Sequence, residues 1–266
     1  MENITKVHCI NRAMPTNKIF LALLKANLPF EISLYYNLPQ HEISSFFHRE
    51  LGTVSQAIQA PITIIDGKTF AGGWSAFWYI CENYLPELVQ DTDTIKYIEW
   101  VLWIDPLYGM LSSLHYASLY SNADQRGIVR KRHLSEFKTF NRMAIINDML
   151  KESDYLYNNR RSIYDLALFS FIWPLKESAG YNKIWTAHLV TDESSESPRT
   201  YDFSEYIHIS SWYDRMKKEY MSDPVSIIKT TFPELHEQAP PRWRVGTPTN
   251  KYNRYTLTWQ PMLIEK

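Results

Sequence analysis

The sequence that says most about the fold is residues 60–73, which read APITIIDGKTFAGG. Pro61 predicts a strand that opens on proline, because proline gives up a ladder donor and is tolerated at a strand's first residue or in a cis turn. Asp66-Gly67 predicts a two-residue hairpin turn, since both residue types accept positive φ. A short second strand follows, and Gly72-Gly73 then leads into a helical pattern over residues 74–84, where glycine would let a ligand approach the backbone.

The residues before this stretch predict a strand, a helix and another strand. Residues 6–10 (KVHCI) read as the first strand, and residues 19–26 (IFLALLKA) read as a buried helix with Pro15 in its first turn. Apolar residues alternate over residues 30–35, and a weaker helix is expected near residues 43–51. The predicted order is therefore β-α-β-α-β-β-α, which is thioredoxin-like, with the first two strands parallel.

The pattern changes from about residue 88 onward. Residues 90–94 (QDTDT) form a polar break, and the following apolar residues recur at helical spacing. Ser162 with Asp165 predicts a capping box at the start of a helix. The proline-rich segment 233–266 cannot be helical throughout and is expected to wrap over the body. We therefore predict an α/β thioredoxin-like domain over 1–88, an all-α domain over 89–232 and a Pro/aromatic-rich tail over 233–266.

Composition excludes several classes of function. The formal net charge of −1 over 266 residues leaves no basic excess, so nucleic acid is not an expected partner. There is no secretory signal and no run of about 18 apolar residues, so we expect a cytoplasmic protein without a membrane span. The two cysteines, Cys9 and Cys81, have no metal-site spacing, and His41 and His48, seven residues apart and able to share a helix face, lack a third ligand, so no metal is expected. The 15% aromatic content suits either core and dimer packing or an aromatic-lined ligand cleft.

Three segments together resemble the glutathione transferase superfamily, in its theta and phi types. They are residues 18–31, residues 60–80, and the Ser162–Asp165 capping box taken with residues 206–212. The resemblance covers roughly residues 4 to 225. It implies a glutathione-site domain followed by a helical domain, glutathione as the possible cofactor, and a homodimer that binds a small hydrophobic molecule.

The resemblance also implies where the sulfur of glutathione would lie, namely between the first strand and the first helix. A thiol of pKa about 8.5 is mostly protonated at neutral pH, so the family holds it with a hydroxyl. That position falls on Ala13, which can donate nothing, and the candidate catalytic residues are therefore Thr16, Asn17 and Arg12. A thiolate would meet a hydroxyl, an amide and free N–H groups at the helix start. Alternatively, Thr16 and Asn17 cap the helix, and Arg12 is an exposed loop residue.

The implied glutathione-binding residues are Ala60, Pro61, Gly72 and Gly73. The backbone before Pro61 would pair with the cysteinyl part, whereas the family's acidic or amide residue and serine fall on Gly72 and Gly73. Losing a charge-assisted contact costs about 1.5–3 kcal/mol, so we expect weakened or altered glutathione binding. The glycines would otherwise form a plain loop or admit a bulkier ligand.

The long helix that opens the second domain is where this family builds its substrate wall. Part of that helix must also pack into the core. The candidate substrate-binding residues are Tyr97, Trp100, Ile104, Tyr108, His115 and Tyr116.

Two functions remain open from the sequence. The first is an enzyme of glutathione transferase type that carries out thiol transfer, elimination or isomerisation on a small hydrophobic or aromatic compound. The second is a non-catalytic binding or interaction protein that keeps the two-domain fold.

Overall fold

The computed structural model describes residues 4–10, 15–36, 61–120, 142–176, 205–220 and 253–259. These residues fall into two compact units. The N-terminal unit holds the described residues up to Pro86 together with residues 253–259, and the helical unit holds the described residues from Glu87 to Tyr220. None of the helices described is both long enough and apolar enough to cross a membrane.

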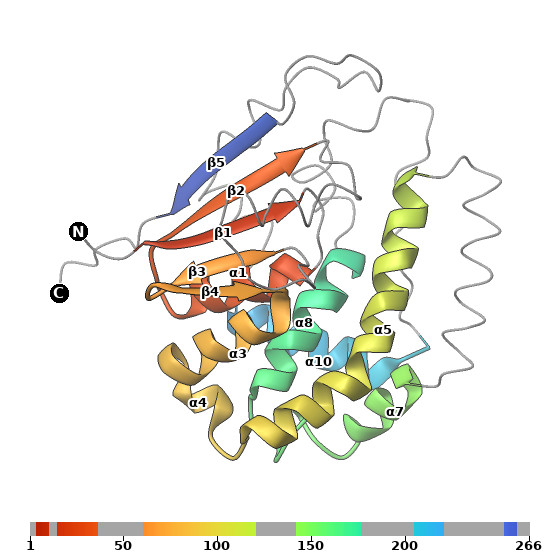
Figure 1. The fold of residues 1–266 in the computed structure, drawn as a ribbon. Helices are drawn as coiled ribbons and strands as arrows, with labels where there is room; N and C mark the ends of the chain where they lie inside the picture. Colours follow the sequence, from red (N-terminus) through yellow and green to blue (C-terminus); the bar gives the residue numbers. More distant parts are fainter. Residues whose placement is uncertain are drawn as a thin grey trace. The chain divides into compact units, whose positions relative to one another are not determined.

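The N-terminal unit is built on one five-stranded sheet. Its strands are β1 (Thr5–Ile10), β2 (Phe30–Tyr36), β3 (Ile62–Ile65), β4 (Lys68–Ala71) and β5 (Asn253–Trp259). The strand order is β4-β3-β1-β2-β5 (Figure 1). β1 and β2 run parallel, as predicted, and the remaining pairs are antiparallel.

Helices α1 (Pro15–Lys25) and α3 (Gly73–Tyr84) pack together in this unit. The apolar run Ile19–Leu23 of α1 is buried, and the ring of Phe20 meets the ring of Phe30 on β2 edge to face at 5.7 Å. Asp66 and Gly67 have φ angles of 51° and 71°, which confirms the predicted hairpin turn. The helix predicted near residues 43–51 lies outside the described residues.

The C-terminal strand β5 was not predicted. Instead of serving only as a proline-rich wrapping segment, residues 253–259 (NRYTLTW) pair with all of β2, from Phe30 with Trp259 to Tyr36 with Asn253. Figure 1 shows β5 in blue beside β2 at one side of the sheet. An edge strand leaves a row of N–H and C=O groups open to other chains, and β5 occupies that edge of β2. The sequence analysis missed this strand because it treated the whole tail as proline-rich, although the seven residues of the strand contain no proline.

The helical unit confirms the change of pattern after the α/β segment. Its helices are α4 (Pro86–Val89), α5 (Thr94–Tyr120), α7 (Arg142–Met149), α8 (Ile163–Lys176) and α10 (Ile207–Tyr220). The chain passes from one unit to the other at α4. α8 is buried from Ile163 to Trp173, and both α5 and α10 pack against it. Its buried stretch has little amphipathic pattern because neighbouring helices cover it on several sides.

A buried carboxylate, that of Asp165, ties the start of α8 to α10. Its Oδ2 accepts hydrogen bonds from Ser162 N at 3.0 Å and Ser162 Oγ at 2.6 Å, and its Oδ1 accepts from Leu156 N and Trp212 Nε1, both at 2.9 Å. The carboxylate half of the predicted capping box is therefore formed. Burial raises the pKa of Asp165, and these hydrogen bonds oppose that rise.

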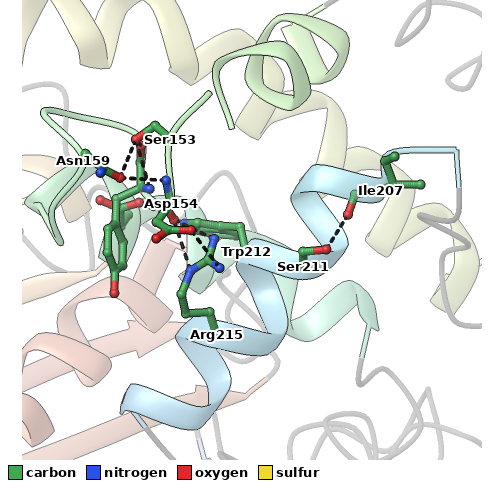
Figure 2. A network of polar contacts seen from close by, with 9 residues as sticks. Ser153, Asp154, Asn159, Ile207, Ser211, Trp212 and Arg215 are labelled. Atoms are coloured by element: carbon green, nitrogen blue, oxygen red, sulfur yellow. Dashed lines mark hydrogen bonds and ion pairs between the residues drawn. The ribbon is translucent and has the colours of Figure 1, made fainter. Parts of the chain in front are cut away.

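A second polar network ties α10 to the loop before α8, one turn along α10 from Trp212 (Figure 2). The guanidinium of Arg215 donates to the carbonyl oxygen of Asp154 from Nε at 3.2 Å and from Nη2 at 2.8 Å, and pairs with its carboxylate at 3.2 Å. Asn159 Oδ1 accepts from Asp154 N and Ser153 Oγ, which folds the loop before α8 back on itself. α10 is thus held through Trp212 by the first turn of α8 and through Arg215 by the segment that precedes α8.

Candidate functional site

The candidate site in the N-terminal unit is formed where α1 and α3 begin. The carbonyl oxygen of Pro15 lies 2.8 Å from the place where a Cβ on Gly73 would stand. The two helix starts therefore touch at the level of the backbone. Two of the segments that the sequence assigned to glutathione, the α1 start and the Gly72-Gly73 pair, are brought together.

Gly72 shapes the entry into α3. Its φ of 81° and ψ of 170° belong to a region that essentially only glycine adopts, and no atom of the described residues lies within 4 Å of the Cβ that it lacks. Its N–H donates to the carbonyl oxygen of Pro61 at 2.9 Å, which joins the start of β3 to the start of α3. The glycine is thus required by the turn, and the space beside it is open.

The hairpin between β3 and β4 is also tied to α3. The Asp66 carboxylate accepts hydrogen bonds from the hydroxyls of Tyr79 at 3.0 Å and Tyr84 at 2.5 Å. Burial, with the hydrogen bond to Asp66, raises the pKa of Tyr84 to about 12, so Tyr84 stays a donor. The Gly72 bond ties the start of α3 to β3, and the Tyr79 and Tyr84 contacts tie the middle and the end of α3 to the hairpin turn.

Thr16 and Asn17 lie in the first turn of α1 and are both buried. The thiol of Cys9 donates to the carbonyl oxygen of Ser33 at 3.7 Å, and the buried Thr16 hydroxyl makes no hydrogen bond within the described part of the chain. Burial raises the pKa of Cys9 to about 12, and Thr16 pulls it the other way. Cys9 therefore stays a thiol at neutral pH, as expected for a buried structural cysteine.

Two of the predicted site residues, Arg12 and Ala60, lie outside the described residues, as does Ala13. The structure therefore places Thr16, Asn17, Pro61, Gly72 and Gly73 from the sequence-predicted thiol and glutathione positions.

The sequence analysis missed Lys18 as a site residue. Its side chain is only 1% exposed, and its Nζ lies 4.0 Å from the centroid of the Trp74 ring. A Cβ on Gly73 would stand 2.9 Å from both Cε and Nζ of Lys18. The sequence did hold a signal that Lys18 is buried. This lysine directly precedes the apolar run 19–24, and that run predicts a buried helix.

The described candidate substrate residues of α5 lie on the face that packs in the helical unit. Tyr97, Ile104 and Tyr108 are buried, and Trp100 is half-buried. The ring of Trp100 lies 5.0 Å from that of Tyr164, and the ring of Tyr108 lies 3.8 Å from that of Phe171, both on α8. These four side chains belong at least in part to the helical core. His115 and Tyr116 are on the same helix, and their side chains are outside the described part.

Among the described residues, no group of three or more His, Cys, Asp or Glu side chains could hold a metal ion. The carboxylates of Asp66 and Asp165 accept hydrogen bonds within the protein, and that of Asp154 pairs with Arg215.

The fold is that of the glutathione transferases. A thioredoxin-like sheet with α1 and α3, followed by a helical unit, defines this class, and solved members of it match the chain along most of its length. No protein-family model and no curated protein sequence matches the chain.

Three solved structures illustrate the likeness. A glutathione transferase from Phanerochaete chrysosporium, solved with oxidized glutathione, is 15% identical, with 89% of this chain and 97% of that chain covered and a TM-score of 0.57. A glutathione transferase from Populus trichocarpa is 16% identical, with coverages of 85% and 99% and a TM-score of 0.57. A glutathione S-transferase from Methylobacillus flagellatus, solved with glutathione bound, is 14% identical, with coverages of 89% and 99% and a TM-score of 0.53. At such identities the likeness establishes the fold.

Proposed function

We propose that this protein is a glutathione transferase-like enzyme that joins a thiol to a small hydrophobic or aromatic electrophile, with weakened or altered binding of glutathione. The observation that carries the proposal is the meeting of the α1 and α3 starts, with the Pro15 carbonyl oxygen 2.8 Å from the missing Cβ of Gly73. The first N–H groups of a helix have no partner within that helix, so two helix starts side by side supply donors for an anionic sulfur.

In the proposed reaction a thiolate sulfur attacks the electrophilic carbon, a C–S bond forms, and the leaving group departs with its electron pair. Thr16 and Asn17 are the proposed groups that keep the sulfur ionised, with Arg12 beside them. The backbone at Ala60 and Pro61 is proposed to bind the backbone of the cysteinyl part of the thiol substrate. Lowering a thiol pKa by one unit requires about 1.4 kcal/mol of preferential stabilisation of the thiolate.

The proposed substrate is a small hydrophobic molecule held by residues of α5. Support comes from the aromatic character of that helix, including the half-buried Trp100. His115 and Tyr116, on the same helix, are proposed as further substrate-binding residues.

We further propose a cytoplasmic homodimer. Three apolar side chains of α5, Ile95, Ile98 and Leu102, are 70%, 50% and 71% exposed and recur at spacings of three and four residues. Such a stripe on one helix face is costly to leave in water and suits a second copy of the chain. Cys9 and Cys81 form no disulfide, which is compatible with the proposed reducing compartment. Sedimentation velocity tests the dimer, and a monomer at micromolar concentration would contradict it.

The function is tested by conjugation of glutathione to chlorodinitrobenzene. We expect glutathione-dependent activity, and we expect Thr16→Ala to lower kcat/KM at least tenfold because a donor at the α1 start is lost. Thr16→Ser keeps the hydroxyl and is expected to retain most of the activity.

Cys9→Ala is the matched control for a thiol of the protein itself, and most of the activity should remain because the Cys9 thiol does not ionise at neutral pH. Unchanged activity in Thr16→Ala would remove Thr16 from the mechanism. A protein that binds glutathione in a thermal-shift experiment but conjugates nothing would instead favour the non-catalytic binding protein.

A further inference from the structure

Pro106 lies in the interior of α5, and Figure 1 shows that this helix bends along its length. A proline inside a helix has no N–H for the carbonyl oxygen four residues earlier, and its ring pushes that carbonyl group away. Proline is therefore a usual cause of a sharp bend. In α5 the carbonyl oxygen of Leu102 loses its helical donor in this way, so the turn before Pro106 is the weak point of the helix.

A side chain from another helix is bonded to this same turn. Arg142 is the first residue of α7, and its Nε donates a hydrogen bond to the carbonyl oxygen of Trp103 at 2.7 Å. The bond is partly buried, and its donor belongs to a charged guanidinium, which makes it stronger than a hydrogen bond between neutral groups. Arg142 thus holds α5 directly beside the bend.

Helix α7 is itself fixed within the helical unit. Its residue Ile146 is buried, and Asn147 Oδ1 accepts hydrogen bonds from the N–H groups of His208 at 3.0 Å and Ile209 at 3.3 Å, at the start of α10. Arg142 therefore connects the bend of α5 to a helix that is tied to the core of the unit.

The bend decides where the second half of α5 points. The ring of Tyr108, just after the bend, packs on Phe171 of α8, and the helix then continues to Tyr120. His115 lies nine residues after Pro106. At 1.5 Å per residue this is a rise of about 13 Å, so a change of about 10° in the helix direction moves His115 by about 2 Å. A displacement of that size is enough to impair the placement of a substrate.

We propose that Arg142 is a positioning residue that holds the second half of α5 in the direction at which His115 and Tyr116 meet the electrophile. This inference rests on the proposed function, because it assumes that these two residues bind the substrate. It concerns the electrophile alone, since the thiol is proposed to bind at the N-terminal unit.

Two variants that differ in one donor test the proposal. Arg142→Met removes the N–H, whereas Arg142→Gln places an amide N–H at the same position along the side chain as Nε. In the conjugation of glutathione to chlorodinitrobenzene, we expect Arg142→Met to raise KM for chlorodinitrobenzene about fivefold or more and to leave KM for glutathione within about twofold. Arg142→Gln should stay within about twofold of the wild type for both substrates.

Arg215→Met is the matched control for a loss of stability. Arg215 lies in the same unit and also donates to a backbone carbonyl oxygen, that of Asp154, at 2.8 Å, but this bond holds α10 and not α5. We expect Arg215→Met to unfold at lower urea concentration and to keep both KM values. The same rise of KM in Arg215→Met and Arg142→Met would reduce Arg142 to a stabilising residue and overturn the proposal.

A distance measurement tests the bend without catalysis. Ser113→Cys in the second half of α5 and Asp148→Cys at an exposed position of α7 carry spin labels, while the buried Cys9 and Cys81 stay unlabelled. We expect Arg142→Met to shift the distance between the labels by about 2 Å or to broaden its distribution. Arg142→Gln should keep the distance of the wild type.

The outcomes separate this proposal from the proposed function. An unchanged label distance or an unchanged KM for chlorodinitrobenzene in Arg142→Met would overturn the role of Arg142, and so would an equally large effect of Arg142→Gln, while the conjugating activity would stand. If the wild type conjugates no thiol, the proposed function falls, and Arg142 has no substrate to position even where the label distance shifts.

Discussion

Replacing Asp165 by alanine is expected to lower the free energy of unfolding by about 3 kcal/mol or more. The carboxylate of Asp165 is 0% exposed and accepts hydrogen bonds from three residues, Leu156, Ser162 and Trp212. Without it, two backbone N–H groups and one indole N–H lose their partner inside the helical unit. Each buried donor left unsatisfied costs about 1–3 kcal/mol.

Urea denaturation followed by tryptophan fluorescence measures this loss. Two variants divide the network: Ser162→Ala removes one hydroxyl donor and is expected to cost about 1 kcal/mol, and Trp212→Phe removes the indole N–H while keeping an aromatic ring. A loss below about 1 kcal/mol for Asp165→Ala would show that Asp165 does not hold α8 and α10 together.

Replacing Gly73 by alanine is expected to destabilise the protein by about 2 kcal/mol, although alanine is the better helix former. The new Cβ would stand 2.8 Å from the carbonyl oxygen of Pro15 and 2.9 Å from Cε and Nζ of Lys18. The lysine end could move, but the carbonyl belongs to the backbone of α1. The two helices must therefore move apart for the methyl group to fit.

Gly109 gives a control of opposite sign. It lies within α5, and a Cβ there would meet none of the described atoms within 4 Å. Gly109→Ala should therefore stabilise the protein by about 0.5–1 kcal/mol through helix propensity alone. Thermal unfolding of both variants under the same conditions measures the contrast. A stabilised Gly73→Ala variant would mean that α1 and α3 do not approach as closely as described.

Local sequence patterns correctly predicted those parts of the fold that are determined by residues close together in the chain. The hairpin at Asp66-Gly67, the helix after Gly73 and the carboxylate that caps α8 each follow from residues a few positions apart. The tertiary partner of Asp165 could not be read in this way. Trp212 lies 47 residues further along the chain, and nothing local indicates that its indole N–H turns toward that carboxylate.

The candidate site shows the same division. The sequence located the start of α1 and the two glycines before α3, because proline and glycine carry a strong local preference. It did not locate Lys18, whose buried side chain reaches the ring of Trp74 at the start of α3, a tertiary contact that no local pattern indicates. The sequence analysis interpreted Gly73 as the loss of a side chain that would bind glutathione. The close contact with the Pro15 carbonyl oxygen shows that a glycine is also needed there for α1 and α3 to pack.

The pairing of β5 with β2 also has a consequence for protein synthesis. The first four strands of the sheet leave the ribosome before the helical unit is translated, and β5 leaves after it. At 5–20 residues per second the delay between β4 and β5 is on the order of 10–40 s. During that time the nascent chain carries an incomplete sheet that neighbouring nascent chains could join. Slower initiation of translation and abundant chaperones should therefore raise the yield of native protein.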